Sequence, residues 1–184
     1  MRIISFQCKI FEDSIFLNNI HLKSYSNMEN AYINSPLGTL EIKGDENGLS
    51  SVHFIGTEEK ISAEVPNFLQ KTAHQLEEYF EGTRTEFNLK LNPEGTDFQK
   101  KVWGKLEEIP FAKTVSYQAI ANRLGDPKVI RAAASANGKN PIAIIIPCHR
   151  VIGSDGSLTG YAGGLHRKKW LLEHECPVKQ QSLF

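Results

Sequence analysis

The chain has few cysteines, and their spacing is unsuited to pairing. Cys8, Cys148 and Cys176 are far apart and form no CxxC pair. An odd number of widely spaced cysteines argues against a disulfide framework and favours a reducing compartment, so we expect a cytoplasmic protein. With 184 residues, 40% of them hydrophobic, the chain can bury a substantial core without covalent cross-links.

Long apolar runs are also missing. None approaches the ~18 residues that a membrane-spanning helix needs. The first residues make a poor secretory signal, because charged Glu12 and Asp13 interrupt them before any small-residue cleavage site. We therefore expect no membrane partner.

The patterns that bind common cofactors are absent as well. The sequence has neither the glycine pattern of a Rossmann fold nor a phosphate loop. Cys8, His21 and His53 could meet at a metal, but no ligand-like spacing supports such a site. We expect no cofactor and no metal.

Net charge is zero, but the charge is unevenly distributed. Residues 1–95 carry 8 Lys and Arg against 14 Asp and Glu, which gives −6, whereas residues 96–176 carry 12 against 7, which gives +5. A basic second half fits contact with a polyanion such as nucleic acid, and it equally fits an ordinary solvated surface. Charge alone does not decide between them.

The pattern along the chain predicts two domains between an N-terminal extension and a short tail. Residues 31–95 contain a turn, a hairpin of two strands, a helix that closes at Gly82, and a short alternating strand over 87–91. The Asn92–Gly95 break is the expected domain boundary. We therefore assign residues 1–27 to an extension of unknown role, 28–95 to an α/β domain, 96–176 to a second domain and 177–184 to a tail.

The second domain begins with three predicted helices, each with a capping residue. Thr96 can cap the first, Ser116 the second and Asp126 the third, which carries Pro127 at its first position. The link between the last two is so short that they resemble a helix-turn-helix. The third helix is rich in alanine, which suits tight packing inside a domain or close approach to a nucleic-acid groove, and both can hold on different faces.

The run Ile142–Ile146 leads into Pro147, Cys148 and His149. A short Ile-rich run predicts a buried strand, and Pro147 would end it. Cys148 is then expected where buried structure gives way to a turn, a position that can face a pocket. The segment alone fits either an activated thiol or a structural cysteine beside a surface histidine.

Taken together, these features resemble the O6-alkylguanine-DNA alkyltransferases. The helix pair, Asn140-Pro141, the Pro-Cys-His-Arg-Val segment and the Tyr161–Glu175 region occur in that order. The match is close over residues 96–176, looser over 31–95 and absent over 1–27. It implies an α/β (α+β) protein with a small ribonuclease-H-like sheet-plus-helix N-terminal domain. A mostly helical domain with the helix-turn-helix and the active site follows.

The resemblance implies DNA repair by a methylated-DNA–protein-cysteine methyltransferase. An alkyl group of O6-alkylguanine passes to Cys148, and activity on O4-methylthymine is left open. Because a free thiol is mostly protonated in the cell, a base is needed. The resemblance implies that His149 is this base, acting through a bridging water, and that Glu175 orients its imidazole. Tyr117 would donate a proton toward the departing guanine. Asn140 would brace the backbone of the active site. A stable thioether makes each molecule act once.

The resemblance also implies how double-stranded DNA with an alkylated guanine is held by a monomer. The damaged base is rotated out of the stack, and Arg131 fills the space while the alanine helix lies in the minor groove. The expected groove contacts are Ala132, Ala133 and Ala136. The expected pocket residues are Val151, Tyr161, Ala162 and Lys168. Many relatives have serine in place of Ala162 and glycine in place of Ala134, which leaves the alkyl-size range and the closeness of approach open.

Three other readings of the same residues remain. A non-catalytic damage sensor would grip alkylated guanine without reacting, and Cys148 argues against it. A helix-turn-helix regulator would need dimers and sequence-specific contacts in the major groove. A cysteine hydrolase with the same Cys-His-Glu relay would turn over repeatedly.

Overall fold

The computed structural model describes residues 28–56 and 61–176. The predictions for residues 1–27, including Cys8 and His21, and for the tail 177–184 lie outside the described residues. Within the described ranges, no helix is both long and apolar enough to cross a membrane.

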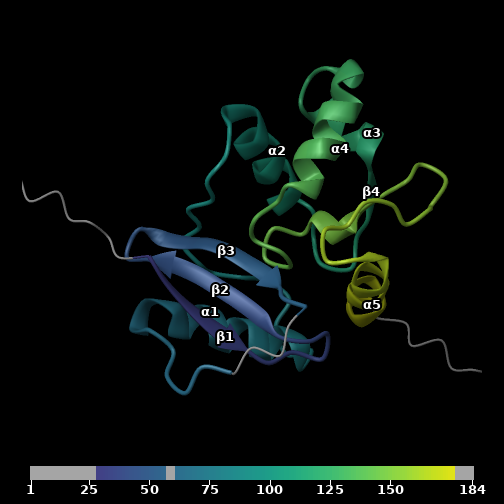
Figure 1. The fold of residues 1–184 in the computed structure, drawn as a ribbon. Helices are drawn as coiled ribbons and strands as arrows, with labels where there is room; N and C mark the ends of the chain where they lie inside the picture. Colours follow the sequence, from purple (N-terminus) through teal and green to yellow (C-terminus); the bar gives the residue numbers. More distant parts are fainter. Residues whose placement is uncertain (1–27, 57–60, 177–184) are drawn as a thin grey trace, which may run out of the picture.

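The N-terminal domain is a three-stranded antiparallel sheet with one helix packed on it (Figure 1). Its elements are β1 (Glu29–Ile33), β2 (Leu40–Asp45), β3 (Gly48–Phe54) and α1 (Asn67–Phe80). Ile42 of β2 lies between Ala31 and Val52 of its neighbours, and all three are buried. Leu69 and Leu76 place the apolar face of α1 in the same core. The predicted hairpin and helix are confirmed, whereas β1 was missed because its sequence lacks strict alternation.

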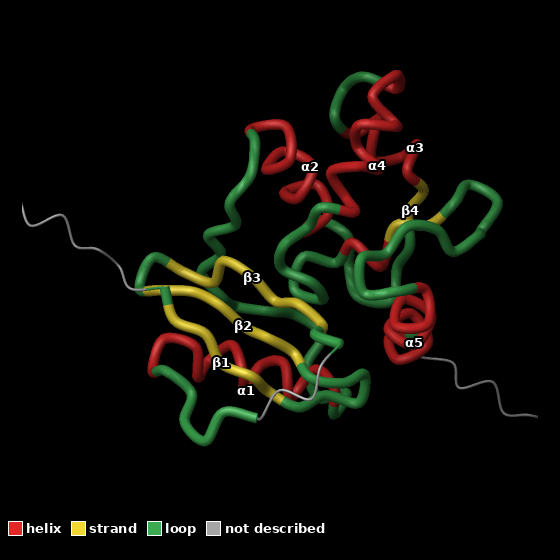
Figure 2. Tube along the Cα trace, in the orientation of Figure 1, coloured by secondary structure: helices red, strands yellow, loops and turns green. Residues whose placement is uncertain are grey.

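The C-terminal domain is mainly helical, as Figure 2 shows. Its elements are α2 (Asp97–Glu107), β4 (Val115–Ser116), α3 (Tyr117–Arg123), the 3₁₀ turn η1 (Pro127–Val129), α4 (Ile130–Gly138), the 3₁₀ turn η2 (Cys148–Arg150), β5 (Val151–Ile152) and α5 (Leu165–Glu175). The predicted caps form: Thr96 accepts from the Gln99 amide, Ser116 from Ala119 and Asp126 from Lys128. These caps satisfy amides that have no partner inside the helix. The two-domain fold class is confirmed.

Two predicted strands are wrong. Residues 87–91 form no strand beyond a single bridge between Leu91 and Leu49. The isoleucines of residues 142–146 are buried as predicted, but the segment forms tight turns in which the Ile146 amide donates to the Ile142 carbonyl. Beyond a single bridge between Ile142 and Val52, local turn bonds therefore replace the expected strand pairing. In addition, the predicted third helix opens with the η1 turn and becomes α-helical only at Ile130.

The two domains meet along β3. The Val52 amide donates to the Pro141 carbonyl at 2.9 Å, and the Ala143 amide donates to the Val52 carbonyl at 3.1 Å. Residues 141–143 thus run beside β3 like a very short extra strand. The segment that leads to Cys148 is anchored to the N-terminal sheet.

Candidate functional site

Cys148 opens the η2 turn directly after Pro147 and is only 5% exposed. Its Sγ accepts a hydrogen bond from Asn140 Nδ2 at 3.2 Å. Burial raises the pKa of the thiol, although the Asn140 bond and the charge of Lys168 act in the opposite direction. The resting group is therefore a protonated thiol at neutral pH, and a nucleophilic role requires a base.

Asn140 ties together the turns that lead to this thiol. Its Oδ1 accepts from the Ile142 amide at 3.0 Å, and its Nδ2 donates to the carbonyls of Ile142 and Ile146 at 3.3 and 2.8 Å. Ile144 lies between them in the left-handed region, with φ of 72°. This conformation is costly for a β-branched residue, of order 1–3 kcal/mol, and persists only where surrounding contacts enforce it. The side chain of Asn140 supplies such contacts.

His149 is completely buried beside Glu175. Its Nε2 lies 2.8 Å from Glu175 Oε1. Burial lowers the pKa of the imidazole, while the hydrogen bond and charge of Glu175 act to raise it, so the ring is neutral at pH 7. Because a carboxylate only accepts, Nε2 carries the proton and Nδ1 keeps its lone pair. Nδ1 has no hydrogen-bond partner among the described residues, which leaves it free to act as a base.

Glu175 is the centre of a buried polar cluster from several elements. Arg150 donates from Nε to Oε2 at 2.9 Å and from Nη2 to Oε1 at 3.0 Å. Tyr79 donates its hydroxyl to Oε1 at 2.9 Å, and the Ala112 amide donates to Oε2 at 3.3 Å. Burial acts to raise the pKa of this carboxyl, but the bonds and charges of His149 and Arg150 outweigh it and lower the pKa to about 2. Glu175 is ionised throughout the neutral range.

Two members of this cluster were missed by the sequence analysis. Arg150 stands next to His149 in the motif, so its position was a usable signal, and its buried side chain also donates to the Ile109 carbonyl at 2.6 Å. Tyr79 belongs to α1, 96 residues before Glu175. No spacing pattern in the sequence indicates that these two residues are in contact.

A small cavity of about 70 Å³ lies over the thiol. Cys148, Asn140, Tyr161 and Ala162 line it, together with Phe54 from the N-terminal sheet. The side-chain oxygen of Tyr161 has no partner among the described residues. The structure therefore brings two of the four predicted pocket residues to the wall of the thiol's cavity.

The other two predicted pocket residues meet just beside it. Lys168 is fully buried and its Nζ donates to the carbonyls of Val151 and Thr159 at 2.6 and 2.7 Å. Burial lowers the pKa of this ammonium to about 8, with Cys148 acting to raise it. Lys168 thus joins β5 to the loop before Tyr161, and the Val151 carbonyl is already engaged.

Tyr117 begins α3 and faces the same loop. Its hydroxyl donates to the Thr159 carbonyl at 3.1 Å, and the Lys168 ammonium lies 5.9 Å from its ring centroid. Burial raises the pKa of the phenol. The group therefore holds its proton at neutral pH, and that proton points at a carbonyl oxygen.

The α3–α4 pair displays a polar face on α4. Arg131 and Ala132 are exposed, whereas Ala133 and Ala136 are only 1% and 3% exposed. They pack in the core against α2, where Trp103 Nε1 donates to the Ala136 carbonyl at 2.9 Å. Their side chains therefore face the core of the domain rather than the exposed surface of the helix. The exposed residues along α4 and at its two ends include Lys128, Arg131, Ala132, Ser135 and Lys139.

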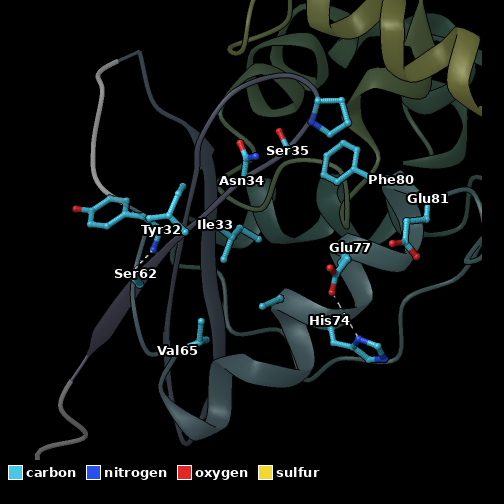
Figure 3. A pocket seen from close by; sticks show the side chains of 13 residues that line it. Tyr32, Ile33, Asn34, Ser35, Ser62, Val65, His74, Glu77, Phe80 and Glu81 are labelled. Atoms are coloured by element: carbon cyan, nitrogen blue, oxygen red, sulfur yellow. Dashed lines mark hydrogen bonds and ion pairs between the residues drawn. The ribbon is translucent and has the colours of Figure 1, made fainter.

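A larger hollow of about 650 Å³ lies between β1 and α1 (Figure 3). Tyr32 and Ile33 come from the strand, and His74, Glu77 and Phe80 come from the helix. None of the predicted site residues lines it. This hollow is separate from the cavity over the thiol.

Comparison with known proteins gives the same family for both domains. Residues 28–93 match the model described as "6-O-methylguanine DNA methyltransferase, ribonuclease-like domain", and residues 97–177 match the corresponding "DNA binding domain". A methylated-DNA–protein-cysteine methyltransferase of Methanosarcina acetivorans is 49% identical over 152 residues, covering 79% of this chain and 96% of that protein.

Two solved structures from Mycobacterium tuberculosis resemble the fold. The O6-methylguanine methyltransferase superposes with a TM-score of 0.73 at 42% identity, covering 80% of this chain and 92% of that one. OGT in complex with DNA gives a TM-score of 0.73 at 44% identity, covering 79% and 91%. The similarity therefore spans both domains of the described chain.

Proposed function

The chain belongs to the 6-O-methylguanine DNA methyltransferase family, and from that premise we propose that Cys148 is its alkyl acceptor. The protein repairs DNA by transferring an alkyl group to its own cysteine, and O6-alkylguanine is the proposed donor. One observation carries the assignment: the Cys148 thiol lines a cavity and is followed in the chain by the buried His149–Glu175 pair.

The reaction needs the thiol to lose its proton, because burial keeps it protonated at rest. His149 Nδ1 takes this proton through a bridging water, and Glu175 stabilises the resulting imidazolium across the 2.8 Å bond to Nε2. The Sγ lone pair then forms a bond to the alkyl carbon, and the bond from that carbon to O6 breaks with its electrons passing to the guanine. The product is a thioether, which this relay does not reverse.

Tyr117 supplies a proton toward the departing base. Its hydroxyl donates to the Thr159 carbonyl in the resting site, so the proton must turn from that carbonyl to the guanine as the base enters. The Ala162 amide is proposed to donate to O6, and the carbonyls of Cys148 and Val151 to accept from the guanine amino group. The Val151 carbonyl keeps a lone pair for this beside its bond to Lys168.

DNA is the macromolecular partner, and the exposed face of α4 is the proposed contact. Lys128 and Lys139 lie at its two ends and suit phosphate contacts. Ala132 offers a side chain small enough for close approach to the minor groove. Arg131 is proposed to occupy the stack in place of the extruded nucleotide. We further propose a monomer that acts in the cytoplasm, since Cys148 is a free thiol and the proposed site is built from one chain.

The proposal is tested by counting products. Duplex DNA with one O6-methylguanine is incubated with a known amount of protein, and repaired guanine is measured over time. We expect repair to stop at one guanine per protein, and the same duplex without the lesion to leave the protein unchanged. Continued turnover, or binding without repair, would contradict the proposed single-use transfer.

A further inference from the structure

The N-terminal domain contributes a hydroxyl to the buried cluster around Glu175. Tyr79 lies near the end of α1, is 0% exposed and donates to Glu175 Oε1 at 2.9 Å. The same oxygen accepts from His149 Nε2 at 2.8 Å. One carboxylate oxygen thus joins a residue of the first domain to the proposed base in the second.

The phenol of Tyr79 is held so that its hydroxyl must point at this oxygen. Its ring packs edge-on against Phe80 and Phe111, with centroids 5.4 and 6.4 Å away, and lies 5.6 Å from Phe87. Its backbone carbonyl also accepts a hydrogen bond from His174 Nε2 of α5 at 2.7 Å. Both the side chain and the main chain of this residue therefore bind the helix that carries Glu175.

We propose that Tyr79 is a positioning residue of the alkyl-transfer site, because its hydroxyl fixes the Glu175 oxygen that orients His149. The catalytic part of this inference rests on the proposed function. A phenylalanine would fill the same apolar space, whereas a buried hydroxyl costs free energy unless a hydrogen-bond partner compensates it. Packing of the two domains alone does not require the oxygen.

The hydroxyl also sets how strongly Glu175 attracts the His149 proton. Oε1 shares its negative charge among Tyr79, His149 and Arg150 Nη2. Removing one donor leaves more charge for the other two, and the bond to His149 Nε2 strengthens. The other groups that face this cluster are the ammonium of Lys168, the imidazole of His174 and the phenol of Tyr161. They stay in place in a Tyr79→Phe variant.

The test is a nuclear magnetic resonance titration of the full chain labelled with ¹⁵N-histidine. In Tyr79→Phe we expect the proton on His149 Nε2 to shift downfield, and the ring to become protonated at a pH higher by about half a unit to one unit. Phe87→Leu is the matched control, because it loosens the packing of the Tyr79 ring and keeps the hydroxyl. An unchanged His149 signal in Tyr79→Phe, or the same shift in Phe87→Leu, would overturn the inference.

Transfer from O6-methylguanine DNA is measured in parallel across pH. In Tyr79→Phe, the His149 signal should shift, and the transfer rate should begin to fall on the acid side at a correspondingly higher pH. If both changes occur, both proposals stand. If the shift occurs while the unaltered protein transfers nothing, the proposed function fails and the link from Tyr79 to His149 remains.

Discussion

Asn140 Nδ2 lies 3.2 Å from Cys148 Sγ while the same amide binds the carbonyls of Ile142 and Ile146. Asn140→Ala removes one of the donors to each of these buried carbonyls and takes away the acceptor of the buried Ile142 amide. We therefore expect the free energy of unfolding to fall by about 2–4 kcal/mol. The rate of alkyl transfer should fall with it, because the thiol loses its support. Denaturant unfolding and a single-turnover assay measure the two effects. Asn122→Ala, on the exposed surface of α3, should change neither by much.

The two faces of α4 separate stability from DNA binding. Ala133 is buried, so Ala133→Leu should overpack the core and lower the free energy of unfolding by about 1–3 kcal/mol. Ala132 is exposed, so Ala132→Leu should leave that free energy within about 0.5 kcal/mol and weaken duplex binding. Denaturant unfolding and a DNA-binding titration measure both variants. Equal effects on stability would mean that the assignment of faces is wrong.

Arg131 is expected to matter only where a base must leave the stack. Arg131→Ala should slow transfer from duplex DNA by about tenfold or more, since extrusion costs a few kcal/mol. Transfer from the free base O6-methylguanine should change little. Arg123→Ala removes an exposed cation from the neighbouring helix α3 and serves as the control. Equal losses on duplex and free base would remove the proposed role.

Glu175 should make the fold sensitive to acid. The pKa of this carboxyl is lowered from 4.5 to about 2 in the folded state, so the unfolded chain binds more protons between these values. Its stabilisation is therefore complete above about pH 4.5 and is lost as the pH falls toward 2.

Glu175→Gln should remove this part of the pH dependence and lower the free energy of unfolding at pH 7 by about 3–5 kcal/mol, because Arg150 loses its charged partner. Thermal unfolding at several pH values measures both. Glu173→Gln, an exposed position on the same helix, should behave like the unaltered chain. A Glu175→Gln protein with an unchanged acid transition would contradict the account.

Local chemistry made much of the fold readable from the sequence. The caps at Thr96, Ser116 and Asp126 act over two or three residues, and they form as expected. The helix of the N-terminal domain shows its apolar face through its spacing. Where tertiary contacts decide, the sequence was misleading: residues 142–146 have the composition of a strand, yet Asn140 and the edge of β3 hold them in turns.

The same division applies to the candidate site. The cysteine and histidine are neighbours in a recognisable motif, and the resemblance added Glu175. The contact of Tyr79 with Glu175 joins two domains and left no signal in the spacing. The alanines of α4 were ambiguous because small residues suit both a packed face and a groove-facing one. Only burial separates Ala133 and Ala136 from Ala132.

The most direct measurement is the location of the transferred group. The protein is reacted with duplex DNA carrying O6-methylguanine, digested, and the methylated peptide is identified by mass spectrometry. We predict one added methyl group on Cys148, and a Cys148→Ala protein that binds the duplex and gains no mass. A methyl group on Cys176, or on any residue of the Cys148→Ala protein, would contradict the central claim.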